Sequence, residues 1–400
     1  MVGQEEINQD AVELPVFEID VEKYAKWGKH LDNAGLTRTG VTVRGADDNP
    51  MSSDPKIRRK GIDANKAALD CCQAAGATAL VGPYHSALGY FSGAGPTKDE
   101  WNWAVEGMRE LLGVPERPLL IPMIKPSIGL TPQQSAKAFY EAALGGADGV
   151  KDDELVVSHP WSHFLDRVRE HEAAAKAAYE ETGQRTLYFV NVTDRPDRLM
   201  ENAHRAIEAG ASALMVNYLT VGISSLSMIA DDPAINVPVL AHLDFSGAIY
   251  GAPWSGVSSH LILGKLPRLA GADVVVYPSP YGKFPFLASK HLRIAQALTT
   301  GLHDIKRSWP MPGGGVQPGM LPLLFGDMGR DFVVGAGGAV HGHPQGPVAG
   351  ARALRQAIDS VMSDGCVQAE ESGQPELAAA LAAWGICEVG VKGDYDRMKG

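Results

Sequence analysis

The sequence predicts an α/β protein in which a (β/α)8 TIM barrel follows an additional N-terminal βα module. From about Arg117 onward, short apolar runs alternate with longer stretches of helical periodicity, which is the pattern of repeated βα units around a parallel sheet. Eight apolar runs occur in this part of the chain, and a closed barrel needs eight strands in roughly 250 residues. The 400 residues therefore accommodate one barrel and a smaller module.

The expected strands of the barrel are short apolar runs. They span residues 119–124, 149–151, 186–191, 213–218, 237–243, 273–277, 309–313 and 331–335. Helical stretches lie between them, and Pro132 suits the first turn of the first helix because its fixed φ is already helical. The expected helices span residues 131–144, 161–182, 195–209, 257–269, 290–299 and 348–363.

The residues before the barrel carry strand and helix signals of their own. The expected strands span residues 14–17, 38–43 and 79–81, and the expected helices span residues 21–32, 55–75 and 98–112. Residues 113–117 contain Gly113 and Pro115, which favour a boundary at this point. The predicted domains are therefore residues 1–112 and residues 113–400.

The charge and composition exclude several classes of protein. Lys and Arg total 36 against 47 Asp and Glu, and this net charge of −11 gives no general attraction to nucleic acid or to an anionic membrane. Long apolar runs and the features of a signal peptide are lacking, so we expect a cytoplasmic protein. The four cysteines show no C-x-x-C spacing, which indicates ordinary thiols.

Charged side chains follow the first two expected strands of the barrel. Lys125 ends the first strand, and Lys151, Asp153 and Glu154 end the second. Alternation along an extended chain places Lys151 and Asp153 on one face, with Glu154 entering the turn. Two carboxylates suit Mg²⁺, and a carbamylated lysine would add a third anionic oxygen. A solvated charged loop is the alternative, but the apolar strand before these residues favours a site.

Glycines follow the last two expected strands, at the positions where barrel enzymes commonly bind phosphate. Gly313, Gly314 and Gly315 follow the seventh strand, and Gly335, Gly337 and Gly338 follow the eighth. Tight barrel turns are the alternative interpretation.

Three histidines lie near expected strand ends. His341 and His343 could suggest a metal site, but turn histidines are favoured because no third ligand has suitable spacing. His242 and Asp244 share a face at the end of the fifth strand and are candidate groups for proton transfer.

These strand-end residues, in this order, resemble the barrel of the RuBisCO large subunit and, more closely, the RuBisCO-like proteins. The resemblance covers residues 117–363, and its most specific segments are residues 124–126, 145–154 and 337–344. It implies that Lys151, Asp153 and Glu154 hold Mg²⁺. Under this resemblance Lys151 is either unmodified or carbamylated.

The resemblance also assigns roles to residues at other strand ends. It implies that Lys125 moves protons at an enediolate and that Lys283 is the lysine of a mobile loop. Asn191 matches a position near the metal. The phosphate-binding turns of the family match Gly314, Gly337 and Gly338, and Gly313 lies beside them.

Departures from the family pattern argue against carbon fixation. Carboxylases carry a His-x-His-Arg run after the fifth strand, whereas this chain reads Ala241-His242-Leu243-Asp244. A histidine of the sixth strand is replaced in residues 274–277, and the serine position of the seventh strand is Pro312 or Gly313. An acid in place of a phosphate-binding arginine would repel a second phosphate, so a monophosphate substrate is expected.

Residues 11–112 resemble a different family, the sugar-phosphate isomerases and epimerases related to xylose isomerase and tagatose epimerase. The matching segments are residues 12–17, 47–50, 82–89 and 95–101. The metal ligands of that family lie in later strands that this segment lacks, so we do not expect it to catalyse epimerisation by itself.

The leading hypothesis is a Mg²⁺-dependent RuBisCO-like enzyme that forms an enediolate from a keto-sugar phosphate or keto-sugar acid. Enolase, isomerase and decarboxylase chemistry all need the same oxyanion stabilisation and stay open. A sugar epimerase of the xylose isomerase-like family and a non-catalytic chimera are the alternatives. The expected partners are the small-molecule substrate and, by resemblance, a second copy of the chain in a homodimer.

Overall fold

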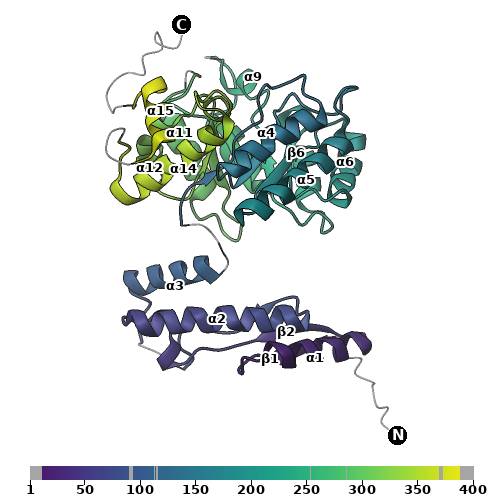
Figure 1. Ribbon diagram of the computed structural model, residues 1–400, viewed down its shortest axis with the longest axis vertical. Coiled ribbons are helices and arrows are strands. Elements are labelled where there is room, and N and C mark those ends of the chain that lie inside the picture. The colour runs from purple at the N-terminus through teal and green to yellow at the C-terminus, as the bar shows by residue number, and fades with distance from the viewer. Residues whose placement is uncertain are drawn as a thin grey trace. The chain divides into compact units, whose positions relative to one another are not determined.

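The computed structural model describes residues 11–89, 93–111, 113, 116–252, 254–284, 286–368 and 373–387. The chain divides into two compact units, Met1–Glu116 and Arg117–Gly400. The first unit is purple to blue and the second runs from blue-teal to yellow in Figure 1. Leu112 and Pro115, which belong to the expected last helix and boundary, lie outside the described residues.

The first unit is a small parallel sheet with helices. Its strands lie in the order β1 (Ala11–Pro15), β2 (Thr37–Val41) and β3 (Leu80–Val81). Its helices are α1 (Val21–Asn33), α2 (Pro55–Ala75) and α3 (Lys98–Leu111), together with a short 3-10 turn at Ala46–Asp48. The elements expected from the sequence are therefore all present. The core of this unit consists of Leu14, Val16, Tyr24, Ala68, Cys71, Cys72 and Ala75.

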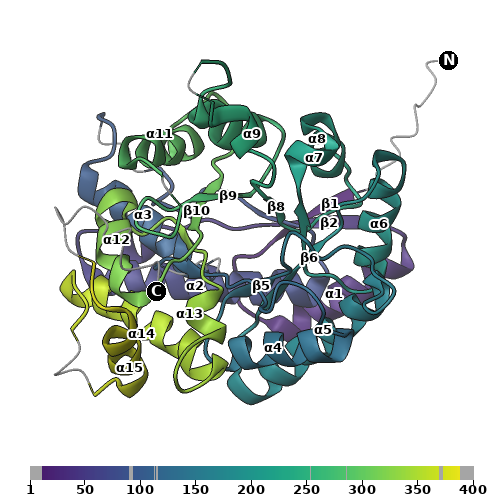
Figure 2. The same ribbon diagram turned by 90° about the horizontal axis from the view of Figure 1, so that it is seen from above.

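The second unit contains the eight parallel strands that the sequence predicts, seen from above in Figure 2. Six pair consecutively in one sheet, and the other two pair with each other. The six are β5 (Gly149–Lys151), β6 (Leu187–Asn191), β7 (Ala213–Val216), β8 (Val239–Ala241), β9 (Val274–Pro278) and β10 (Trp309–Gly313). The remaining two are β4 (Leu119–Leu120) and β11 (Val333–Val334).

Backbone hydrogen bonds join the two sheets at both seams. The Lys151 N–H donates to the Pro122 carbonyl at 2.9 Å, and the Gly335 N–H donates to the Pro312 carbonyl at 3.3 Å. Pro310 and Pro312 have no N–H, so β10 cannot form a full ladder with β11. The described strands therefore close into a ring with one thin seam.

The helices of the second unit surround the ring of strands. They are α4 (Pro132–Leu144), α5 (Phe164–Thr182), α6 (Pro196–Glu208), α7 (Tyr218–Val221), α8 (Ile223–Ala230), α9 (Gly247–Tyr250), α10 (Leu266–Leu269), α11 (Ala288–Thr299), α12 (Leu321–Met328), α13 (Gly338–His341), α14 (Pro347–Asp364) and α15 (Pro375–Trp384).

Two expected helices differ from the structure. Helix α5 begins at Phe164 rather than at residue 161, because Ser162 pairs with His159 in the preceding loop. The expected helix over residues 257–269 contains a π-helical turn at Leu261–Lys265 before α10.

Alternation along each strand separates two apolar layers. Ala213 and Met215 lie in the cluster inside the ring, whereas Leu214 and Val216 lie in the cluster between strands and helices. Each buried side chain of the size of Leu or Met stabilises the fold by roughly 1.5–3 kcal/mol. Within the part of the chain that the structure describes, no helix is both long and apolar enough to span a membrane.

Candidate active site

The charged run at the end of β5 is buried, so the alternative of a solvated loop is wrong. Lys151 is 0% exposed, and Asp152 and Asp153 are each 2% exposed. Val150 belongs to the outer apolar layer, so alternation directs Lys151 and Asp153 toward the ring axis. Glu154 is half-buried and lies in the turn, as expected.

Lys151 is held in a pocket with little solvent. Its Nζ donates to the Asp152 carbonyl at 2.7 Å and lies 3.8 Å from Glu154 Oε2. The sulfur of Met215 lies 3.5 Å from the same nitrogen. Burial lowers the pKa of Lys151 because the charged ammonium is poorly solvated there. A larger neutral fraction favours reaction of this amine with CO2.

Lys125 connects the first two strand ends of the barrel. Its Nζ donates to Asp153 Oδ2 at 2.5 Å and to Ser127 Oγ at 2.6 Å. Burial and the nearby charge of Lys125 lower the pKa of His341 to about 4. His341 is the last residue of the short helix α13, and its buried Nε2 has no hydrogen-bond partner among the described residues.

Glu154 is contacted from three further strand ends. Its carbonyl accepts from Asn191 Nδ2 at 3.1 Å and from Asn217 Nδ2 at 3.0 Å. Its Oε2 lies 3.4 Å from His242 Nε2. Asn217, which was not predicted, directly follows the buried strand β7, and this position at a strand end is the signal that could have identified it.

The imidazole of His242 lies beside the Glu154 carboxylate, with its Nε2 facing Oε2. The Asp244 N–H donates to His242 Nδ1 at 3.3 Å, which leaves the ring proton on Nε2. Burial, followed by the charge of Lys151, lowers the pKa of His242 well below its usual value. The imidazole is therefore neutral at pH 7.

Other predicted residues lie outside this cluster of contacts. Lys283 is exposed, and its Nζ lies 5.3 Å from the centre of the Phe284 ring. Its N–H donates to the Gly314 carbonyl at 2.8 Å. The contact of Asp244 with His242 uses the main chain, and its carboxylate forms no ion pair within the described part of the chain.

The glycines at the ends of β10 and β11 differ in why the structure requires glycine at each position. Gly314 has a φ of 85°, which favours glycine. A Cβ at Gly337 would lie 2.5 Å from the Met123 side chain, so this position requires glycine for close packing. Gly313 ends β10 and is buried, whereas Gly338 is exposed at the first residue of α13.

The donor set was tested against a hard divalent cation. No three His, Cys, Asp or Glu side chains of the described residues are placed to hold a metal ion by themselves. Asp153 and Glu154 supply two carboxylates, and the third anionic oxygen has to come from a carbamate on Lys151. The buried amine of Lys151 beside Glu154 suits this modification. The residues therefore fit the cation once Lys151 carries CO2.

The fold and the site together define an α/β barrel with lysines, carboxylates and a neutral histidine at neighbouring strand ends. The family described as the catalytic domain of the ribulose bisphosphate carboxylase large chain matches residues 104–284 and 293–384. The match covers more than half of the chain, and the protein belongs to this family. The resemblance of residues 117–363 to this family is thereby confirmed.

Individual relatives agree with this assignment. A ribulose bisphosphate carboxylase-like protein of Archaeoglobus fulgidus is 50% identical over 282 residues, which are 70% of this chain and 64% of that protein. The chain thus spans less than two thirds of the length of this relative. A 2,3-diketo-5-methylthiopentyl-1-phosphate enolase of Geobacillus kaustophilus is 41% identical over 298 residues, covering 73% of this chain and 72% of the enolase.

Solved structures show the same relationship. A RuBisCO-like protein (MtnW) of Alicyclobacillus acidocaldarius is 41% identical with a TM-score of 0.65, covering 70% of this chain and 71% of that one. Octameric RuBisCO of Pyrococcus horikoshii is 31% identical with a TM-score of 0.66, covering 71% of this chain and 67% of that one. The family match begins at residue 104, so it gives no support to the xylose isomerase-like resemblance of residues 11–112.

Proposed function

We propose that the barrel is a Mg²⁺-dependent RuBisCO-like enolase for a diketo-sugar phosphate, with 2,3-diketo-5-methylthiopentyl 1-phosphate as the first candidate substrate. The observation that carries the proposal is the convergence of Lys125, Lys151, Asp153, Glu154 and His242 from three strand ends. Relatives named as enolases of this substrate share about two fifths of the aligned residues, as the Geobacillus protein does at 41%.

The proposed chemistry divides between the cation and the chain. Mg²⁺ bound to Asp153, Glu154 and carbamylated Lys151 would stabilise the oxyanion that develops on the substrate carbonyl. Lys125 Nζ, beside Asp153 and Ser127, is the group that moves the proton from the carbon next to that carbonyl. His242 lies beside Glu154, with Nε2 3.4 Å from Oε2, and restricts where this carboxylate can move.

The substrate would carry one phosphate. The turns that contain Gly313, Gly314, Gly337 and Gly338 follow the seventh and eighth strands of the barrel, where such enzymes commonly bind phosphate. Asp244 stands where the family carboxylases carry a phosphate-binding arginine, and its negative charge opposes a second phosphate. Bisphosphate carboxylation is therefore not part of the proposal.

Three finer assignments stay proposals. Lys283 is proposed to close over the substrate, which requires its exposed loop to move. A homodimer is proposed because related structures are oligomeric and include a dimeric RuBisCO of Hyperthermus butylicus, and a cytoplasmic location is proposed from the sequence alone. For the first unit, a partial xylose isomerase-like module that does not catalyse epimerisation by itself is proposed from the sequence alone, without support from the family match.

The decisive experiment is proton exchange in D2O with Mg²⁺ and bicarbonate present. Wild-type protein should exchange the proton next to the carbonyl of 2,3-diketo-5-methylthiopentyl 1-phosphate and form the enol, detected by NMR and ultraviolet absorbance. Lys125→Met should lose this exchange, whereas Lys137→Met, a change at an exposed lysine of α4, should retain it. Absence of exchange by a wild-type protein that binds Mg²⁺ would refute this activity.

A further inference from the structure

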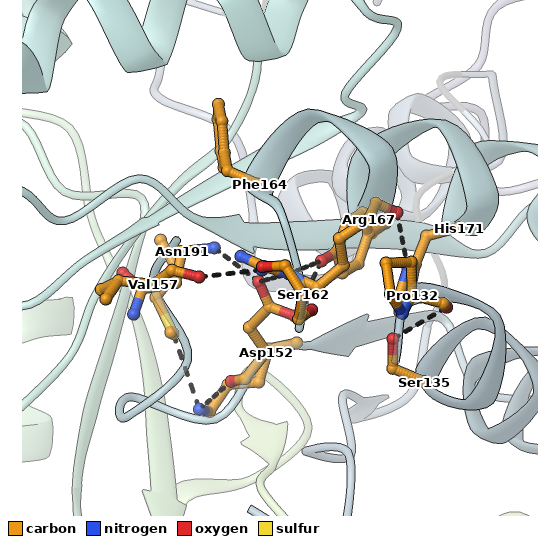
Figure 3. Close-up of polar contacts among 12 residues, drawn as sticks. Pro132, Ser135, Asp152, Val157, Ser162, Phe164, Arg167, His171 and Asn191 are labelled. Carbon is orange, nitrogen blue, oxygen red and sulfur yellow. Dashed lines mark hydrogen bonds and ion pairs between the residues drawn. The ribbon is translucent and has the colours of Figure 1, made fainter. Parts of the chain in front are cut away.

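Asp152 lies between two candidate ligands but faces the opposite way. Strand alternation directs Lys151 and Asp153 toward the ring axis and Asp152 toward the helix layer, where it meets Arg167 of α5 (Figure 3). Asp152 is 2% exposed and Arg167 is 1% exposed. This carboxylate is thus buried on the side of β5 that faces away from the ring axis.

The Asp152 carboxylate is held by three donors, two from β6 and one from α5. Tyr188 Oη donates to Oδ1 at 2.7 Å, and Arg167 Nε donates to Oδ2 at 3.2 Å. The Asn191 N–H also donates to Oδ2 at 3.0 Å. A single buried side chain therefore joins the end of β5 to β6 and α5.

These contacts continue directly into the candidate metal site. The carbonyl of Asp152 accepts the hydrogen bond from Lys151 Nζ, and the side chain of Asn191 donates to the carbonyl of Glu154. Arg167 Nη1 also donates to the Val157 carbonyl at 2.9 Å, which fixes the loop after Glu154. Asp152 is therefore linked directly to Lys151 through its carbonyl, and to Glu154 through Asn191.

The buried ion pair of Asp152 and Arg167 is an expensive way, in solvation free energy, to stabilise the fold. Two charges that leave water each lose favourable solvation, and a buried ion pair recovers this loss only with good geometry and further hydrogen bonds. Arg167 Nη2 has no hydrogen-bond partner within the described residues, so the pair is not fully compensated. A well-packed apolar pair would serve stability as well, whereas it could not orient the peptide groups of the site.

We infer that Asp152 is a positioning residue of the candidate metal site, acting through its own carbonyl on Lys151 and through Asn191 on Glu154. This inference rests on the proposed function, because it assumes that Lys151, Asp153 and Glu154 bind the cation. Groups that orient metal ligands from behind typically change metal affinity by 10–100-fold when they are removed. Asp152 should have an effect of this size without contacting Mg²⁺.

The other end of the same strand provides a matched control. Asp148 directly precedes β5 and accepts from Arg117 Nη2 at 2.9 Å and from Arg355 Nη2 at 2.7 Å. It also accepts from the Leu120 N–H at 2.8 Å. Asp148 is therefore another shielded carboxylate with arginine and backbone partners, but it lies at the end of β5 away from the candidate ligands.

The test compares Asp152→Asn with Asp148→Asn by calorimetric titration of Mg²⁺ in bicarbonate and by 13C NMR of the Lys151 carbamate. We expect Asp152→Asn to weaken Mg²⁺ binding by about 10-fold or more and to reduce the carbamate signal. Asp148→Asn should destabilise the fold but leave both readouts within about 2-fold of wild type, as expected for a group remote from the ligands. Equal Mg²⁺ affinity in Asp152→Asn and wild type would overturn the inference.

A gentler pair of variants decides the question if Asp152→Asn does not fold. Tyr188→Phe removes the donor to Asp152 Oδ1 together with an acceptor of Arg167 Nε. Tyr218→Phe removes an equally buried hydroxyl that donates to the Ile262 carbonyl away from the site. Only Tyr188→Phe should weaken Mg²⁺ binding, and equal affinities in both variants would overturn the inference. Failure of wild-type protein to bind Mg²⁺ would instead refute the proposed function.

Discussion

The Nζ of Lys125 lies 2.5 Å from Asp153 Oδ2, so a candidate proton carrier is paired with a candidate metal ligand. Lys125 follows β4 and Asp153 follows β5, and the two strands meet at one seam of the ring. A cation bound to Asp153 would compete with this ion pair. Metal binding and the freedom of Lys125 are therefore coupled by a single carboxylate.

Asp153→Asn and Glu154→Gln should each abolish Mg²⁺ binding, because each removes one of only two carboxylate ligands. Calorimetric titration in bicarbonate provides the measurement. Asp166→Asn, a change at an exposed acid of α5, is the control and should bind as wild type does. Unchanged Mg²⁺ affinity in both site variants would disprove the metal assignment.

Ribulose bisphosphate should not be carboxylated by this protein. By the family resemblance, Asp244 lies where the carboxylases carry a phosphate-binding arginine, and its negative charge would repel a second phosphate. Incubation with radiolabelled bicarbonate and Mg²⁺ tests the prediction, with an authentic RuBisCO as the positive control. Label in an acid-stable product would contradict it.

Deletion of residues 1–112 should leave a folded barrel that still binds Mg²⁺. The second unit contains its own closed ring of strands and its own apolar clusters. Circular dichroism and Mg²⁺ titration of the truncated chain provide the measurement, with the full chain as reference. An aggregated product would show that the first unit fills a structural gap in the barrel.

Acid should destabilise the second unit through His171. Burial lowers the pKa of His171 to about 4, while an unfolded histidine titrates near 6.5, so the unfolded state binds more protons between these values. Stability from this group is complete above pH 6.5 and falls as the pH drops toward 4. The expected loss between pH 7 and pH 5 is about 2 kcal/mol.

His171→Phe isolates this contribution, since a phenyl ring can keep the stacking on Tyr188, whose ring centre lies 4.1 Å from that of His171. Urea unfolding at both pH values should show a smaller acid loss in the variant than in wild type. Equal losses in the two proteins would exclude His171 as the cause.

Tyr281→Phe should impair turnover while leaving Mg²⁺ binding intact. Tyr281 Oη donates to Asp327 Oδ2 at 2.8 Å, which ties the base of the loop that carries Lys283 to α12. Loss of this anchor should lower kcat in the enol-forming assay, because Lys283 is less often positioned over the substrate. Tyr179→Phe, at an exposed tyrosine of α5, is the control, and an unaltered kcat in Tyr281→Phe would reject this role.

Strand periodicity and the residues at strand ends were enough to predict the barrel strands and most of the candidate site residues. Alternation along β5 correctly separated Lys151 and Asp153 from Asp152, and each of the eight strands lies within or within one residue of its expected run. The role of Asp152 was not predictable, because its partner Arg167 lies on a helix whose rotation depends on packing. Asn217 was missed because α7 and α8, which follow it, have no clear pattern of their own.

The pairing of β4 with β11 has a consequence for synthesis on the ribosome. Val333 of β11 pairs with Leu119 of β4. The first strand of the barrel therefore stays unpaired on this side until almost the whole second unit has left the ribosome. Until then, β10 presents an unpaired edge on which a strand of another nascent chain could dock. Pro310 and Pro312 remove two backbone donors from that edge, which protects the incomplete barrel from aggregation. The same two prolines leave fewer hydrogen bonds between β10 and β11 in the complete barrel.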